Sequence, residues 1–380
     1  ASDTVDIQAT HPTGTSNVGF GSGTFENIEA GGTLNTAMGV NALQDLTTGD
    51  NNTAIGYQTA LNATTASGTI AVGSQAIGLG ITTGNYNTAI GYQSGYDLTS
   101  GAYNFFGGAQ AGANATTATG TVAIGSQAIG AGVLTGGGNT AVGYQAGFDL
   151  TSGTYNFFGG YAAGANVTTA DYTIAIGSQA IGLGVTTGDY NIALGRFAGY
   201  DLTSGANNFF AGSYAGFNVT TGIYNISQGY QAGYTATTGS YNIFQGFGAG
   251  YNATTVSSTI AIGRNAIGLG VLTGDHNVAI GYQTGYDLTS GTYNIFSGYQ
   301  AGANVTTGIG NVFSGYQAGE FATTSNYAIA IGHNAIGLGV LTGTDNTAIG
   351  RGAGADLTSG TYNNFIGNGA GANATTADNT

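Results

Sequence analysis

The stretch from Asn87 to Tyr103, N-T-A-I-G-Y-Q-S-G-Y-D-L-T-S-G-A-Y, decides the fold because nearly all of the chain repeats it. With Asn87 as position 1, the same frame fits at 21 starts between Asn17 and Asn363, always 17 or 18 residues apart. Position 5 is Gly in all 21 copies. A fixed period near 20 residues is typical of a solenoid, whose units pack only against their neighbours. The repeat predicts an all-β, elongated parallel β-solenoid (a β-roll or β-helix) of about 21 coils.

Positions 2 to 8 of each coil have the composition of a strand, rich in β-branched residues. Position 3 points to the opposite face from positions 2 and 4. It is Ala where position 4 is Ile, as in Ala89-Ile90, and Phe where position 4 is small, as in Phe106-Gly107. We expect bulk to be exchanged between two packed faces. One face would line the interior and the other would meet a second chain; the alternative is a flattened single chain with both faces inside.

The domain organisation follows the repeat. Coils sort into a cycle of three, so that Thr69, Thr121 and Thr173 are equivalent residues 52 apart, and whole coils are inserted later in the chain. Insertion of entire coils is tolerated when each coil is an independent unit. We predict one solenoid domain over residues 17–380, preceded by a strand-like connector over residues 1–16.

Composition excludes several classes of function. Three Lys and Arg residues against 17 Asp and Glu residues cannot neutralise a nucleic-acid backbone, so no nucleic-acid partner is expected. Without Cys the chain has no disulfides or thiolate metal sites. The sequence contains no run of 18 apolar residues, so no insertion into a membrane is expected. The start at Ala1 is typical of a mature protein after signal cleavage, which favours an extracellular location, at a cell surface or in a matrix; the alternative is a start set by cloning.

Acidic residues fall at two corners of the coil, position 11 (Asp97, for example) and positions 16 to 18 (Asp171, for example). Turn chemistry explains this pattern, since Asp side chains bond backbone groups in turns. A calcium ladder is the alternative, although the nonapeptide that places carboxylates around one ion is absent. His11, His276 and His333 lie at positions that do not converge. We therefore predict no enzyme activity, no catalytic residues and no cofactor other than this possible Ca²⁺.

Two further sets of residues are candidates for surface roles. Position 6 holds all three arginines and tyrosines such as Tyr144 and Tyr282, so we expect it to be exposed and available for lateral contact or adhesion. Asn-x-Ser/Thr sequons are candidate glycosylation sites, with turn Asn residues as the alternative explanation. The sequons are at Asn51, Asn62, Asn114, Asn166, Asn218, Asn225, Asn252, Asn304 and Asn373.

The stretch from Thr173 to Gly184, T-I-A-I-G-S-Q-A-I-G-L-G, and the recurrent N-T-A-I-G resemble the head repeats of trimeric autotransporter adhesins of the YadA type. The period here is longer than in that family. The resemblance implies a surface fibre with parallel coils, and in the family three such chains pack together to bind host matrix or other surfaces.

The two ends of the sequence match in register. Thr380 stands at position 1 of a new coil, like Thr121 and Thr173, and residues 1–16 supply the length that completes it. Thr4, Val5, Ile7, Asn379 and Thr380 are therefore the candidate assembly interface, in which one subunit adds its N-terminal strand to the open coil of the next. The sequence predicts a structural subunit of an extracellular filament or surface fibre that forms a homopolymer. The alternative is a trimeric adhesin head or phage tail-fibre shaft that binds a surface receptor, including glycans.

Overall fold

A computed structural model describes residues 16–29 and 31–380. Residues 1–15, including Thr4, Val5 and Ile7 of the candidate interface, lie outside this part of the chain. Across the described residues the protein is all-β, with 21 strands and no helix. Each strand falls at positions 2 to 4 of one of the 21 coils defined from the sequence, so the predicted parallel β-solenoid is confirmed.

The chain divides into two compact units, Ala1–Tyr190 and Asn191–Thr380. The strands of the first unit are β1 Val18–Phe20, β2 Thr36–Met38, β3 Thr53–Ile55, β4 Ile70–Val72, β5 Thr88–Ile90, β6 Phe105–Gly107, β7 Val122–Ile124, β8 Thr140–Val142, β9 Phe157–Gly159 and β10 Ile174–Ile176. The strands of the second unit are β11 Ile192–Leu194, β12 Phe209–Ala211, β13 Ile226–Gln228, β14 Ile243–Gln245, β15 Ile260–Ile262, β16 Val278–Ile280, β17 Ile295–Ser297, β18 Val312–Ser314, β19 Ile329–Ile331, β20 Thr347–Ile349 and β21 Asn364–Ile366.

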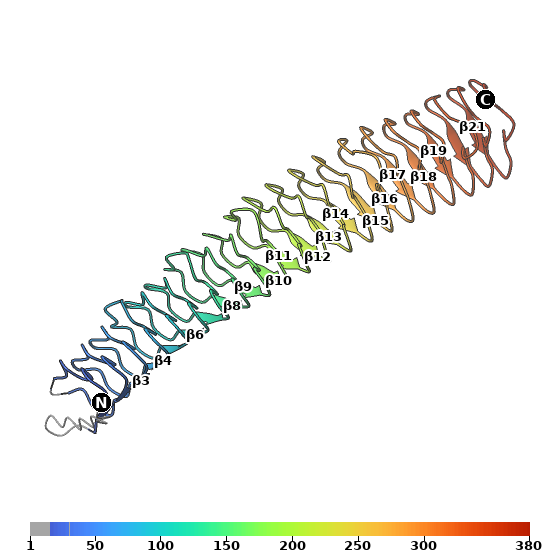
Figure 1. The fold of residues 1–380 in the computed structure, drawn as a ribbon. Helices are drawn as coiled ribbons and strands as arrows, with labels where there is room; N and C mark the ends of the chain where they lie inside the picture. Colours follow the sequence, from blue (N-terminus) through green and yellow to red (C-terminus); the bar gives the residue numbers. More distant parts are fainter. Residues whose placement is uncertain (1–15, 30) are drawn as a thin grey trace. The chain divides into compact units, whose positions relative to one another are not determined.

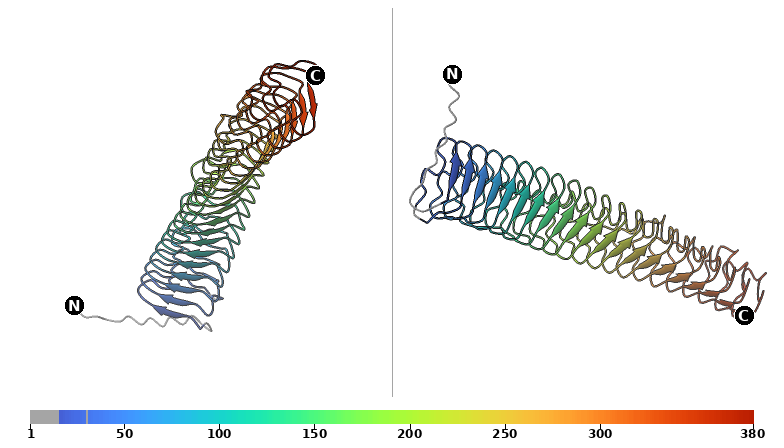
Figure 2. Two further views of the ribbon diagram at one scale, coloured as in Figure 1. Left: turned by 90° about the vertical axis from the view of Figure 1, so that its right-hand side faces the viewer. Right: turned by 90° about the horizontal axis from the view of Figure 1, so that it is seen from below.

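Within each unit, consecutive strands lie side by side and run in the same direction (Figures 1 and 2). The register places like positions opposite each other, as in the pairing of Ala89 with Phe106, both at position 3 of their coils. In the first unit, isolated parallel bridges join the far side of some coils, as between Ala63 and Thr82. Because each coil pairs with the next through the same positions, the 17- or 18-residue period is set by backbone hydrogen bonding.

The strands are shorter than the predicted span of positions 2 to 8. The chain leaves the extended conformation at position 5, where Gly91 has φ 137°, and turns again at Gln93 with φ 51° and Gly95 with φ 60°. A Cβ on Gly91 would lie 2.4 Å from the carbonyl oxygen of Gly108 in the next coil. The invariant glycine therefore permits both an unusual φ and a close approach of two backbones, and it ends the strand.

A ladder of asparagines at position 1 ties the coils together inside the solenoid. The backbone N–H of Asn104 donates to Oδ1 of Asn87 at 3.0 Å, and the Asn104 side-chain nitrogen donates to the Ala118 carbonyl at 2.7 Å. Oδ1 of Asn104 accepts in turn from the backbone N–H of Thr121 at 2.8 Å. These buried amides satisfy backbone groups that the turns leave without a partner, which explains the preference for Asn at position 1.

The packing of the core explains why position 3 is Ala in some coils and Phe in others. Phe106 at position 3 is fully buried, and a Cβ on Gly112 of the same coil would lie 2.4 Å from its ring. A Cβ on Gly95 of the preceding coil would lie 2.8 Å from the same ring. Where position 3 is Ala71 instead, position 9 of the same coil is the fully buried Ile77. Inside the solenoid, positions 3 and 9 of neighbouring coils therefore share one space, which holds either the ring at position 3 or the isoleucine at position 9. The predicted exchange of bulk with position 4 on the opposite face stays a prediction.

Candidate assembly interface

The outer face of the sheet is formed by positions 2 and 4, which point away from the core. In the first unit Ile90 and Ile124 are 45% and 41% exposed, while Ala89 between positions 2 and 4 is fully buried. The alternative of a flattened chain with both faces inside is therefore wrong. The most exposed apolar side chains of this outer face in the first unit are Val18, Phe20, Met38, Ile55, Ile70, Ile90, Phe105, Ile124, Val142, Phe157 and Ile176.

This face is large for a surface in contact with water. If a fully exposed large apolar side chain has roughly 150 Å² of area, the exposed fractions near 40% sum to roughly 700 Å² in the first unit. The largest apolar patch of an ordinary monomer covers about 300–600 Å², and a stable interface buries about 800 Å² on each partner. The second unit carries a similar face, with Ile280 43% and Ile295 48% exposed. The outer face has the size and composition of a protein interface.

Aromatic side chains form stacked rows along the coils. In the first unit Tyr155 stacks on Tyr172 with ring centroids 5.3 Å apart, and Tyr172 stacks on Tyr190 at 5.2 Å. Position 6 forms another row, as predicted: Tyr144 is 45% exposed, and in the second unit the half-buried Tyr282 stacks on Tyr299 at 5.0 Å. Because neighbouring rings cover each other, the rows present edges and hydroxyl groups to solvent.

The arginines and two histidines belong to these rows. The Arg196 guanidinium lies 4.6 Å from the Phe197 ring centroid, and the Arg264 guanidinium lies between Phe247 and Tyr282, at 5.7 and 5.8 Å. Such cation–π contacts hold a charged group against the surface. His333 stacks on Tyr316 at 5.0 Å and His276 stacks on Tyr293 at 4.9 Å, in different rows. The described histidines thus lie where rings stack, and His11 lies outside the described residues.

The two groups of aspartates have different environments. Oδ1 of Asp171 accepts from the backbone N–H of Thr154 at 2.6 Å, so this carboxylate caps the turn of the preceding coil. Burial raises the pKa of the position-11 carboxyls of Asp97, Asp149 and Asp287. Over residues 16–29 and 31–380, no three His, Cys, Asp or Glu side chains are grouped as metal ligands.

The sequon asparagines occupy three kinds of site. At position 11, the side-chain nitrogens of Asn62 and Asn114 donate to the carbonyls of Leu79 and Ala131, each at 2.8 Å. Asn166 and Asn252 make the same bond to the next coil, and Asn218 and Asn304 are half-buried. Asn225 is 1% exposed and belongs to the internal ladder, so a glycan there would require the coil to open. Asn51 and Asn373 are exposed.

The last residues continue the ladder. The backbone N–H of Thr380 donates to Oδ1 of Asn363 at 3.1 Å, and the backbone N–H of Asn364 donates to the carbonyl of Thr380 at 2.6 Å. Thr121 makes the equivalent bond to Asn104. Asn379 adopts φ 56° and donates its backbone N–H to the carbonyl of Thr361. Asn379 and Thr380 therefore hold the backbone positions that open a coil.

Comparison with models of protein families and with curated protein sequences found no match to this chain. The resemblance to adhesin head repeats stays a prediction. The part of the chain that the structure describes contains no helix long and apolar enough to cross a membrane.

Two features of the structure are not predicted from the sequence. The first is the direction of each strand's two faces. Alternation of residues along a strand does not tell whether position 3 or positions 2 and 4 face the core. The second feature is the pair Gly352 and Ala355, where the coil of the same type that begins at Asn277 has Gln283 and Tyr286. The signal for this second feature in the sequence is the replacement of two large side chains by Gly352 and Ala355.

Proposed function

We propose that this protein is a structural subunit of an extracellular filament or surface fibre, with no enzymatic role. The observation that carries the proposal is the apolar outer sheet face of each unit, roughly 700 Å² in the first unit. Covering such a face with a second copy removes apolar area from water and stabilises an assembly. A copy of the same chain fits this role because its face repeats with the same period as the surface it covers.

The end-to-end form of the proposal concerns the edge strand β21. A parallel strand placed beside Asn364–Ile366 would extend the sheet, as each preceding strand in the second unit is extended by the next. The Asn364 N–H already donates to the carbonyl of Thr380, the residue that would precede such a strand. Thr380 holds the opening position of such a coil, and we propose that Thr4, Val5 and Ile7 of a second copy supply the strand that completes it. The stacked coils would then continue from one subunit into the next.

The second candidate is a trimeric adhesin head or tail-fibre shaft. The same apolar face favours it, because three copies that cover their faces side by side would close into one particle. In this form the exposed tyrosine edges would contact a surface, including its glycans. The two candidates differ in mass, since the first gives an open-ended polymer and the second a closed trimer.

The test is negative-stain electron microscopy with light-scattering mass over a range of protein concentrations. Filaments support the main proposal, a trimer at every concentration supports the second, and a folded monomer at high concentration refutes both. Deletion of residues 1–12 is expected to abolish end-to-end filaments and to leave a folded solenoid by circular dichroism. Filaments that persist after the deletion would exclude strand addition by Thr4, Val5 and Ile7.

A surface variant tests the outer face. Thr replaces Ile55, Ile90, Ile124 and Ile176 in one variant; Thr already occupies position 2 on the same face in several coils and is compatible with these strands. We expect side-by-side association to be lost while the fold is retained. The matched control places Thr at the corner residues Leu79, Ile81, Val133 and Val185, which are even more exposed than the four sheet-face isoleucines. Equal loss of association in both variants would exclude the sheet face as the interface.

A further inference from the structure

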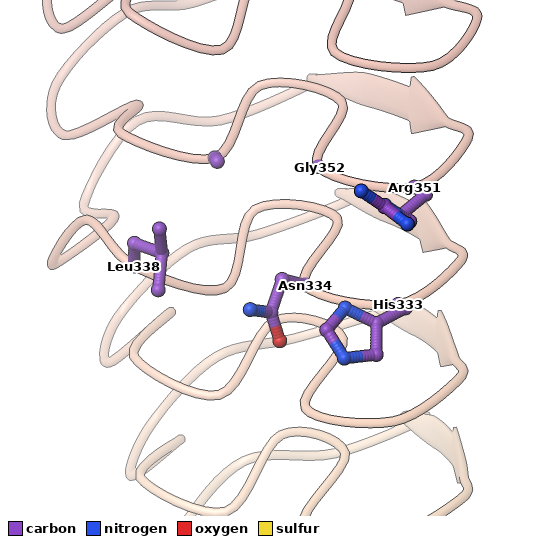
Figure 3. Close-up of a pocket in the computed structure, with 6 residues that line it drawn as sticks. His333, Asn334, Leu338, Arg351 and Gly352 are labelled. Carbon is purple, nitrogen blue, oxygen red and sulfur yellow. The ribbon is translucent and has the colours of Figure 1, made fainter.

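A pocket of about 360 Å³ opens on the second unit where the repeat is broken (Figure 3). Its volume falls within the range of about 300–1,000 Å³ found for small-molecule sites. The pocket is lined by His333, Asn334, Leu338, Arg351, Gly352 and Ala355.

The pocket exists because two side chains of the repeat are missing. Among the coils of the second unit with Asp at position 11, the one that begins at Asn277 has Gln283 at position 7 and Tyr286 at position 10, and the one that begins at Asn191 also has large side chains there; this coil has Gly352 and Ala355. At position 7, the side-chain nitrogen of Gln300 donates to Oε1 of Gln283 at 3.1 Å, which continues a row of amides from coil to coil. A glycine cannot extend this row. The missing amide and the missing aromatic ring leave a hollow beside Asn334.

The polar groups around the hollow are suited to an anion. Arg196 and Arg264 lie over aromatic rings, whereas the coils that flank Arg351 place His333 and Asn368 at position 6. No carboxylate lines the pocket. In Figure 3 the side-chain nitrogen of Asn334 lies on the side of Leu338, and its Oδ1, which is buried without a hydrogen-bond partner, points away. The guanidinium and the amide therefore present donors to the hollow.

The remaining walls add shape to the site. His333 is held in place by stacking on Tyr316, with a centroid distance of 5.0 Å and an interplanar angle of 7°. Leu338 is 58% exposed and forms an apolar wall, and Gly352 and Ala355 leave space between this wall and Arg351. A planar guanidinium matches a carboxylate through two parallel hydrogen bonds. The volume exceeds what a bare carboxylate needs, so a larger group attached to it has room.

We propose that this pocket binds a carboxylate-bearing saccharide unit, a uronic acid. Arg351 binds the carboxylate, the Asn334 amide donates to a ring oxygen or hydroxyl, and Leu338 contacts the carbon face of the ring. The site is half open and the chain carries a net charge of −14, which repels anions at long range. The affinity is therefore modest, with a Kd on the order of 1 mM.

The experiment is ligand-observed NMR titration of the full chain with glucuronate, with glucose as the neutral probe of the same shape. We expect saturable binding of glucuronate and at least tenfold weaker binding of glucose. Equal binding of the two sugars would overturn the role of Arg351. Inorganic sulfate and acetate form the third arm: displacement of glucuronate by either at equal concentration would show a simple anion site and overturn the saccharide assignment.

The repeat supplies variants that fill the pocket with its own residues. Gly352→Gln and Ala355→Tyr restore the side chains of equivalent coils, so the fold is retained, and each should weaken glucuronate binding at least tenfold. Arg351→Gln should do the same by removing the charge. The matched control is Arg264→Gln, at the same position of another coil, which should bind glucuronate as the unchanged protein does. Binding that survives Ala355→Tyr and Arg351→Gln, or that is lost in Arg264→Gln, would refute the proposal. Filament formation is read separately by microscopy.

Discussion

A double-mutant cycle at Phe106 and Gly112 tests how the core accommodates its three-coil cycle. Phe106→Ala removes a fully buried ring and should cost about 3–5 kcal/mol of unfolding free energy. Gly112→Ile places a Cβ 2.4 Å from that ring and should cost at least about 1–3 kcal/mol through overpacking.

The double variant should recover much of the loss. It creates the combination of Ala at position 3 and Ile at position 9 that the chain already uses at Ala123 and Ile129. Ile129 adopts φ 48° and Gly112 adopts φ 58°, so the backbone of this turn accepts an isoleucine. With the ring gone, the new side chain fills the space that it left. We expect the two changes to couple favourably by at least about 2 kcal/mol, within the range for residues in direct contact.

The assay is hydrogen exchange of the amides of residues 104–120, supported by urea unfolding followed by circular dichroism. Exchange is the better readout because long repeat arrays depart from two-state unfolding. Phe158→Ala combined with Gly112→Ile is the control pair; Phe158 lies three coils further on, and its effects should add. Additive effects at Phe106 and Gly112 themselves would refute the explanation that positions 3 and 9 exchange volume.

Three further predictions follow from single sites. Asn104→Ala leaves the N–H of Thr121 without its acceptor inside the solenoid and should cost about 2–4 kcal/mol, measured by urea unfolding. Gly91→Ala places a Cβ 2.4 Å from the Gly108 carbonyl oxygen at φ 137° and should destabilise the first unit by more than about 2 kcal/mol, seen as faster exchange of its neighbouring amides. Asp97→Asn should raise stability at pH 7, by at most about 0.5 kcal/mol. Burial raises the pKa of the Asp97 carboxyl in the folded state. At a pH above that pKa the carboxyl is ionised, and its charge lowers the free energy of unfolding. The gain should vanish below the unfolded pKa of 3.8, and thermal melts at pH 7 and pH 3 that show the same gain would contradict this cause.

The sequence by itself determined the coil. The invariant glycine at position 5 and the asparagine at position 1 recur because stacked backbones approach too closely for a side chain and need amide partners, as at Gly91 and Asn104. Such requirements are local and repeat with every coil, so they are visible as a period. The exposed row at position 6 was predicted for the same reason, since only an exposed position accepts Tyr, Ser, Arg and His alike.

Only the tertiary structure decided which side of each strand is the core. Alternation is symmetric between the two faces, and Ala89 with Ile90 would satisfy it in either direction. The contact between Phe106 and Gly112 decides the matter, because the chain must turn at positions 5, 7 and 9 before these residues meet. The length of the strands and the hollow at Gly352 depend on the same turns. The repeat pattern shows which residue types each position of the coil accepts. Which residues are in contact inside the coil depends on the three-dimensional path of the chain.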